Sequence, residues 1–264
     1  MRDINIMPEN ILNTLARRTE IVKQLNAEER VNVSELSEKF NVSLVTIRKD
    51  LAHLEKKGLL IKSRGGAMKR QAVNFDLTFN QKLKQNYKAK QQIGKKAAEL
   101  ILNGEAILFD SGTTTLEVAK NLGGFSELKV ITNSLPIAEN LSGNKNIELI
   151  LSGGKLRAEM RSLVGPIAEN SLKSVYCDTV FLAVDGIDHQ RGIFTPSIEE
   201  ASICRLMIER SKRVVVVTDS SKFGKHSFSC ISSIDKIDCV ITDSDIPDDQ
   251  RQGLLEKGIE LIVV

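Results

Sequence analysis

From about residue 91 onward, short apolar runs alternate with helical stretches, and this alternation limits the possible folds more than any other feature. The seven apolar runs are 106–109, 130–132, 147–151, 179–184, 214–218, 239–242 and 259–264. Helical stretches separate them, among them 113–122, 135–142, 197–211 and 248–257. Strands that alternate with helices form mostly parallel sheets with helices on both faces. The sequence therefore predicts a doubly wound α/β domain over residues 91–264.

The first 60 residues have a different pattern, that of short helices. Arg17, Ile21 and Leu25 recur at every fourth position and give a first helix an apolar stripe. Residues 31–33 are too short for anything but a turn or a strand stub. Ser34 then has the residue type that caps a second helix.

A third helix is expected from Ser43, its predicted cap, to about Lys57. Its predicted apolar side consists of Leu44, Ile47, Leu51 and Leu54. Its predicted outer side carries Thr46, Lys49, Asp50, His53 and Lys57. A helix, a tight turn and a helix with a small, polar and cationic outer side predict a helix-turn-helix.

The segment after the third helix predicts a basic hairpin. Extended residues flank Gly65 and Gly66, and Lys62 and Arg64 lie in the hairpin. Such a wing makes residues 1–70 a winged helix-turn-helix domain. Residues 71–90 have little periodicity and are predicted to be a linker. The lysines of this linker either border DNA or are simply solvated: Lys82, Lys84, Lys88 and Lys90.

The charge distribution indicates a polyanionic partner for the N-terminal part. Residues 1–96 contain 20 Lys and Arg against 10 Asp and Glu, whereas residues 97–264 contain 17 against 24. A basic half next to an acidic half favours double-stranded DNA as the partner. The candidate DNA-binding residues are Ser34, Ser43, Thr46, Arg48, Lys49, His53, Lys62 and Arg64. Ser43, Thr46 and Lys49 are placed to touch base edges and Arg48 to hold a phosphate, although an ordinary solvated helix face is the alternative.

Several classes of protein lack their minimal residues here. No apolar run approaches the roughly 18 to 20 residues of a membrane span, and no apolar signal core follows the first residues, so a cytoplasmic protein without membrane contact is expected. The sequence contains no HExxH, GxSxG or Walker motif and no CxxC pair. We therefore expect no metal, no cofactor and no catalytic residues, and buried free thiols for most of its four cysteines.

Polar and glycine-rich segments follow five of the predicted strands. The first is Asp110-Ser111-Gly112-Thr113-Thr114, whose N–H groups at residues 112–114 are predicted to hold a phosphate at a helix N-terminus. Ligands bind beyond the carboxyl ends of strands in such sheets. The alternatives are a plain helix cap and ordinary turns. The candidate effector-binding residues are Asp110, Ser111, Gly112, Thr113, Thr114, Thr132, Asn133, Gly153, Gly154, Arg161, Asp185, Glu200 and Lys222, and they suit a small phosphorylated sugar.

These segments together resemble the DeoR family of bacterial transcriptional repressors. The resemblance rests on Ser43-x2-Thr46-Ile47-Arg48-Lys49-Asp50-Leu51 and on the segments 65–67, 110–114, 132–133, 152–154, 184–186, 200–201 and 218–222. At the strand ends the chain is similar to the amino-sugar and galactitol-type regulators of this family. The resemblance implies a repressor of a sugar-catabolism operon that a phosphorylated sugar releases from its operator. It also implies a C-terminal domain similar to ribose-5-phosphate isomerase.

Two departures and two alternatives accompany this resemblance. Residues 192–197 lack the lysine and glycine run of the isomerases, and Cys204 stands where family members often carry lysine. The main alternative is a sugar-phosphate isomerase with an appended DNA-binding domain, in which Asp185, Asp188 or Glu200 would be a general base. A phosphosugar-responsive activator is a further alternative. Because one winged helix touches few base pairs, a homo-oligomer is expected, either a dimer or a tetramer.

Overall fold

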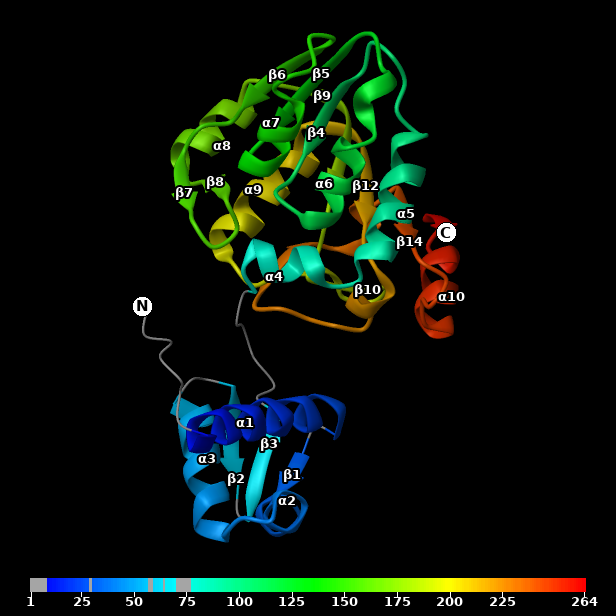
Figure 1. Ribbon diagram of the computed structural model, residues 1–264. Helices are drawn as coiled ribbons and strands as arrows, with labels where there is room; N and C mark the ends of the chain where they lie inside the picture. The colour runs from blue at the N-terminus through cyan, green and yellow to red at the C-terminus, as the bar shows by residue number, and fades with distance from the viewer. Residues whose placement is uncertain (1–8, 29, 57–58, 64, 70–76) are drawn as a thin grey trace, which may run out of the picture. The chain divides into compact units, whose positions relative to one another are not determined.

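The computed structural model describes residues 9–28, 30–56, 59–63, 65–69 and 77–264 (Figure 1). The chain divides into two compact units, Met1–Ala72 and Val73–Val264. Lys57, Arg64 and residues 71–76 of the predicted linker lie outside the described residues. In the part of the chain that is described, no helix is both long and apolar enough to cross a membrane.

The N-terminal unit is a winged helix-turn-helix. Its helices are α1 (Glu9–Glu28), α2 (Val33–Phe40) and α3 (Leu44–Lys56). Its strands are β1 (Arg30–Asn32), β2 (Leu60–Ser63) and β3 (Gly66–Lys69), in the order β1-β3-β2. The antiparallel pair β2–β3 is the predicted wing, and the predicted strand stub pairs with it as β1. A single apolar core joins the helices and strands, built around Ile21, Leu25, Leu36, Ile47 and Leu51.

Two side chains cap the helices of the helix-turn-helix. The Asn32 side-chain oxygen accepts a hydrogen bond from the Ser34 N–H at 2.9 Å, so Asn32 caps α2. The prediction that Ser34 is this cap is wrong, because Ser34 lies inside the first turn, where its side chain is exposed. The predicted cap of α3 is present: Ser43 Oγ accepts from the Thr46 N–H at 3.1 Å.

The buried side of α3 differs from the predicted one at two positions. Leu44 is 43% exposed, whereas Asp50, which was predicted on the outer side, is 1% exposed. Arg17 Nε lies 2.6 Å from one Asp50 carboxylate oxygen, and Arg18 Nε lies 2.7 Å from the other. Two guanidinium groups from α1 therefore neutralise the buried carboxylate of α3, which makes its burial possible.

The C-terminal unit contains one large parallel sheet. Its strands are β4 (Ala106–Phe109), β5 (Leu128–Thr132), β6 (Ile147–Leu151), β9 (Cys177–Leu182), β12 (Ser211–Val217), β14 (Cys239–Thr242) and β15 (Glu260–Val263). Their order is β15-β14-β12-β9-β4-β5-β6, and every neighbouring pair is parallel. The seven predicted strands are confirmed: β4, β6 and β14 have the predicted ends, and the other four have ends shifted by one to three residues.

Helices cover both faces of this sheet, as predicted for a doubly wound domain. One apolar core contains side chains of α8 (Pro166–Lys173), α9 (Ile198–Glu209) and α10 (Asp248–Glu256). The other contains side chains of α5 (Tyr87–Ala98), α6 (Thr113–Ala119) and α7 (Leu135–Leu141). Successive residues of a strand point to opposite faces, so Leu108 lies in the first core and Phe109 in the second.

Two smaller sheets, which the sequence did not predict, lie beside the large one. The hairpin of β7 (Lys155–Arg157) and β8 (Ser162–Val164) forms one of them. The other contains β10 (Gly186–Asp188), β11 (Gly192–Thr195) and β13 (Ser229–Ser232). Their strands have only three or four residues, which is too few for an alternation of polar and apolar residues to be recognised.

The linker predicted for residues 71–90 is too long. Residues Phe79–Lys84 form the helix α4, and Tyr87 begins α5. Phe79 is buried in the core of the C-terminal unit, and Lys82 and Lys90 are buried as well. Residues 77–90 therefore belong to the α/β unit.

Candidate functional site

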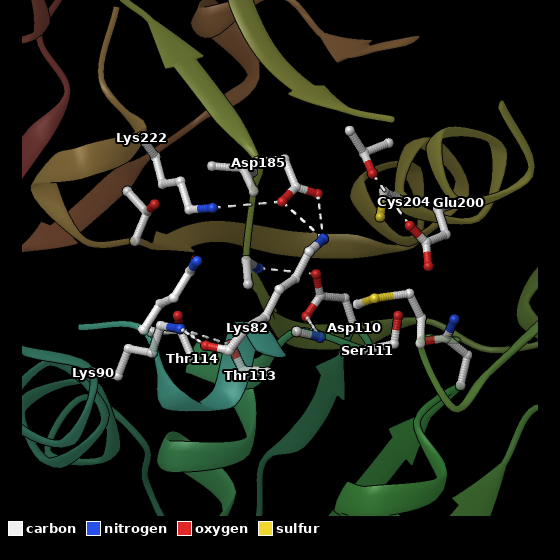
Figure 2. A pocket seen from close by; sticks show the side chains of 18 residues that line it. Lys82, Lys90, Asp110, Ser111, Thr113, Thr114, Asp185, Glu200, Cys204 and Lys222 are labelled. Atoms are coloured by element: carbon white, nitrogen blue, oxygen red, sulfur yellow. Dashed lines mark hydrogen bonds and ion pairs between the residues drawn. The ribbon is translucent and has the colours of Figure 1, made fainter. Parts of the chain in front are cut away.

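A pocket lies where the four central strands of the large sheet end (Figure 2). Many of its residues follow β12, β9, β4 and β5, which are neighbours in the sheet, and others come from α4, α5 and α9. The strand order reverses between β4 and β9, and open α/β sheets bind ligands at such a point. The lining residues are Lys82, Gln85, Lys90, Asp110, Ser111, Gly112, Thr113, Thr114, Asn133, Met160, Ala183, Val184, Asp185, Thr195, Glu200, Cys204, Thr218 and Lys222.

Two lysines face one carboxylate on the first side of this pocket (Figure 2). Lys82 Nζ, from α4, lies 2.8 Å from Asp185 Oδ1 and 3.0 Å from Oδ2. Lys222 Nζ, from the segment after β12, lies 3.6 Å from Asp185 Oδ1. Burial acts to raise the pKa of Asp185, but the two ammonium groups hold this pKa below its ordinary value. Asp185 is therefore an anion at neutral pH.

A third lysine adds positive charge to the same side. Lys90, from α5, is 3% exposed, and its Nζ donates to the Lys82 carbonyl oxygen at 2.6 Å and to Thr113 Oγ1 at 3.0 Å. Burial lowers the pKa of Lys90 to about 8, and the negative charge of Asp219 partly opposes this. Lys90 is thus mostly protonated at pH 7. Lys82, Lys90 and Lys222 thus set three ammonium groups against the carboxylates of Asp185 and Asp219, and this excess of positive charge attracts an anion.

The Asp110 side chain connects the segments that follow β4 and β9 by hydrogen bonds to both. Its Oδ1 accepts hydrogen bonds from the Gly112 N–H at 3.0 Å and from Thr115 Oγ1 at 2.7 Å. Its Oδ2 accepts from the Ala183 N–H at 2.9 Å. Burial raises the pKa of Asp110 to about 7, against the effect of these three donors. Both carboxylate oxygens are thus occupied by protein groups, which indicates a structural role at the pocket floor.

The phosphate seat predicted from the N–H groups of residues 112–114 needs a correction. The Gly112 N–H already donates to Asp110, so it is not offered to the pocket. Glycine is required here by space, because a Cβ at position 112 would lie 2.1 Å from the Ala183 Cβ. Within the described residues, the lysine ammonium groups are therefore expected to bind an anion more strongly than the backbone N–H groups of residues 112–114.

Asp110→Asn is expected to destabilise the C-terminal unit by about 1–3 kcal/mol. The amide keeps one acceptor oxygen and turns an NH₂ group toward a backbone N–H, so one buried donor loses its partner. Urea unfolding of the full chain would measure the loss. The control is Ser111→Ala, because the Ser111 hydroxyl makes no hydrogen bond within the described residues. Equal stability of Asp110→Asn and the wild type would contradict this structural role.

The opposite side of the pocket holds a neutralised carboxylate and two sulfur atoms. Glu200, in α9, forms an ion pair with Arg157 and accepts hydrogen bonds from Ser162 Oγ and Thr195 Oγ1, both at 3.2 Å. Cys204 lies one turn further along α9, and burial raises the pKa of its thiol well above the ordinary value. Cys204 and Met160 therefore present uncharged sulfur to the pocket.

The structure brings nine of the predicted effector-binding residues to this pocket: Asp110, Ser111, Gly112, Thr113, Thr114, Asn133, Asp185, Glu200 and Lys222. The other four do not line it: Thr132, Gly153, Gly154 and Arg161. Arg161 Nη2 pairs instead with Glu139 Oε2 at 3.1 Å. Gly154 has a φ of 118° and lies against the Val164 carbonyl group, so it serves local packing.

Sequence reasoning missed the pocket residues of α4 and α5, which are Lys82, Gln85 and Lys90. It placed them in a linker because their segment is rich in Asn, Gln and Lys. The sequence nevertheless contains an apolar spacing that is typical of a helix. Phe79 and Leu83 are four residues apart, and both pack on the apolar core of the C-terminal unit.

Of the predicted DNA-binding residues of the helix-turn-helix, Ser34 lies in α2 and the others lie on or beside α3. Arg48 and Lys49 are exposed, and Thr46 and His53 are partly exposed. Ser43 Oγ lies 2.9 Å from Thr46 Oγ1, so these two hydroxyl groups bond to each other. The exposed side of α3 is consequently polar and cationic over most of its length.

In the wing, Lys62 is tied to α3. Its N–H donates to Glu55 Oε1 at 3.0 Å, and its Nζ lies 3.4 Å from Glu55 Oε2. The backbone hydrogen bond from Lys62, together with its ammonium group, lowers the pKa of the exposed Glu55 carboxyl group. Both side chains are nearly half exposed, so the ion pair is weak and leaves Lys62 able to turn toward a phosphate.

The cysteine side chains of the described residues are free thiols, most of them buried. No group of three or more His, Cys, Asp or Glu residues that could hold a metal ion occurs in the described ranges. Cys177, Cys204 and Cys239 are buried free thiols, as the sequence predicted, and Cys230 is an exposed free thiol.

Comparison with known domains and structures gives matches to both units. Residues 17–71 match the DeoR-like helix-turn-helix domain, and residues 85–244 match the DeoR C terminal sensor domain. Among solved structures, ribose 5-phosphate isomerase A from Methanocaldococcus jannaschii is similar at 16% sequence identity and a TM-score of 0.40. That match covers 53% of this chain and 55% of the isomerase chain.

Curated proteins match over nearly the whole length. A putative aga operon transcriptional repressor from Escherichia coli O157:H7 is 38% identical over 97% of this chain and 96% of its own length. The HTH-type transcriptional regulator GlpR from Haloferax volcanii is 36% identical over 93% of this chain and 96% of its own. Both are named as regulators and not as enzymes. Because both domains and the full-length relatives agree, the chain belongs to the DeoR family of DNA-binding transcriptional repressors.

Proposed function

We propose that this chain represses a sugar-catabolism operon and leaves its operator when a small phosphorylated sugar binds in the C-terminal pocket. The observation that carries the proposal is the group of three lysines around Asp185. A phosphate group carries more negative charge than one carboxylate, so it competes well for these ammonium groups. The serine, threonine and asparagine side chains nearby suit the hydroxyl groups of a sugar.

The DNA contacts are proposed for the helix-turn-helix and the wing. Ser43, Thr46 and Lys49 would touch base edges, while Arg48 and Lys62, which lies in the wing, would hold phosphates. Ser34 and His53 complete the proposed set within the described residues. Arg64 belongs to it by sequence alone, because it lies outside them.

The oligomeric state of the regulator is also a proposal. We propose that it acts as a homo-oligomer, a dimer or a tetramer, because two winged helices bound to two half-sites have an affinity that one winged helix lacks alone.

An isomerase activity is not favoured by the pocket. Of the three candidate bases, Asp185 and Asp188 have lowered pKa values, which weakens them as bases, and Glu200 forms an ion pair with Arg157.

Operator release by a sugar phosphate tests this function. The full chain is mixed with a duplex taken from the region upstream of its own gene, and DNA binding is titrated with a panel of sugar phosphates and their unphosphorylated parents. At least one sugar phosphate is expected to weaken DNA binding about tenfold, within the usual range for coupled sites, and its parent sugar to have no effect. Equal responses to a sugar phosphate and its neutral parent would contradict the phosphate site. Inorganic phosphate at the same ionic strength is the control.

A further inference from the structure

The outer side of α3 has an apolar residue at its centre. Successive residues of a helix are about 100° apart, since 3.6 residues make one turn. The buried side of α3 is marked by Ile47, Leu51 and Leu54. Val45 and Lys49 are one turn apart on the opposite side, so they occupy the middle of the exposed face. Val45 is 56% exposed, and Lys49 is exposed as well.

A valine is an unexpected choice at this position. A single exposed apolar side chain is common on protein surfaces and by itself means little. However, valine forms helices less well than alanine, and position 45 packs into no apolar core of the described residues. Local stability therefore gives no reason for a β-branched side chain here.

The hydroxyl groups next to Val45 are already hydrogen-bonded within the helix, whereas the Val45 side chain is exposed and packs on no other group of the N-terminal core. Ser43 Oγ accepts from the Thr46 N–H and is hydrogen-bonded to Thr46 Oγ1. Both hydroxyl groups are thus engaged in capping the helix. The first residues of a recognition helix are those that reach base edges in the major groove. In this groove, the C5-methyl group of thymine is the apolar feature that a side chain can read.

We propose that Val45 contacts the C5-methyl group of a thymine in the operator and helps to specify an A·T pair there. The inference rests on the DNA-binding part of the proposed function and adds a residue to it. Val45 reads the methyl group, and Lys49, one turn along the same face, contacts the adjoining base or phosphate. Serine and lysine at this helix start offer no methyl group to the C5-methyl group of thymine, whereas valine offers two.

Selection and methyl removal test this proposal. The full chain first selects its preferred duplex from a random-sequence pool. Each thymine of that duplex is then replaced singly by deoxyuridine, which lacks only the methyl group. For the wild type, one position in each half-site is expected to lose about 4-fold in affinity, as follows from about 0.8 kcal/mol per buried methyl-sized group. Val45→Ala removes the contact from both half-sites at once, so it should bind the original duplex about 16-fold more weakly, 4-fold for each half-site, and be insensitive to deoxyuridine at that position.

The matched control is Ile61→Ala. Ile61 lies in the wing strand β2 and is 47% exposed, so its removal also takes an exposed apolar group from the same unit. This variant should keep the full 4-fold sensitivity at the thymine that Val45 reads. Val45→Ala replaces valine by a better helix former, so its folding is expected to be intact.

The possible outcomes separate the two proposals. A chain that enriches no sequence from the pool contradicts the proposed function and this inference with it. A chain that enriches a sequence, but whose Val45→Ala variant responds to every deoxyuridine as the wild type does, contradicts this inference alone. Loss of methyl sensitivity in Val45→Ala at that one position of each half-site, and at no other thymine, supports it.

Discussion

Asp50→Ala is expected to remove a large part of the free energy of unfolding of the N-terminal unit, while the C-terminal unit keeps its stability. Asp50 is the shared partner of Arg17 and Arg18, whose side chains are 12% and 24% exposed. Removing one partner of a buried ion pair costs about 3–5 kcal/mol, since the remaining charge stays buried without compensation. We expect the lower end, about 3 kcal/mol, because Arg18 is exposed enough to regain water.

This loss is large compared with the stability of so small a unit. Folded proteins are stable by about 0.05–0.15 kcal/mol per residue, which gives roughly 4–10 kcal/mol for the whole N-terminal unit. Hydrogen exchange of the full chain, read peptide by peptide, is the suitable measurement. Amide protection should fall sharply in α1 and α3 and remain unchanged in β4 and β9. DNA binding should weaken along with the protection of α3.

Glu38→Ala is the control, since it removes an acidic group that is exposed in the same unit. It should leave the protection of α1 and α3 as in the wild type. Asp50→Asn should lie between the two, because its amide oxygen accepts one of the two hydrogen bonds without carrying the charge. If Asp50→Ala were as protected as Glu38→Ala, the carboxylate would not hold α1 against α3.

The sequence predicted the large sheet well because its inner strands, such as β4, β9 and β14, are buried on both faces. Continuous apolar runs such as 106–109 and 239–242 are therefore visible without any knowledge of the fold. The helix-turn-helix was recognised for a similar reason, since Ile47, Leu51 and Leu54 have helical spacing. In both places the pattern of apolar residues follows directly from burial.

Sequence reasoning failed where burial depends on a partner far along the chain. Asp50 is buried because Arg17 and Arg18 reach it from α1, more than 30 residues earlier. Lys82 is buried because Asp185 lies 103 residues later. An isolated charged residue predicts an exposed position, so both were misplaced, and with Lys82 the helix α4 was assigned to a linker. Long-range ion pairs thus account for the principal errors in the site.

The ion pairs of Asp185 with Lys82 and Lys222 lead to the second large expected effect, which is on ligand binding. Lys222→Met is expected to weaken binding of the effector sugar phosphate by about 10- to 150-fold, the equivalent of a lost hydrogen bond to a charged group of about 1.5–3 kcal/mol. Lys222 Nζ is 3.6 Å from Asp185 Oδ1, whereas Lys82 Nζ is 2.8 Å from the same oxygen. An incoming phosphate therefore draws Lys222 away from Asp185 more readily than Lys82. Methionine keeps the length of the side chain, and Asp185 keeps Lys82 as its partner.

Calorimetry of the full chain with the sugar phosphate that releases the operator measures this change. Lys225→Met is the matched control, because Lys225 lies three residues further on, is exposed and does not line the pocket. It should bind the sugar phosphate as the wild type does. Lys222→Met should also keep its full affinity for operator DNA and lose only the response to the ligand. If both variants bound the sugar phosphate equally well, the phosphate would not lie between Lys222 and Lys82, and the lysines around Asp185 would serve the fold alone.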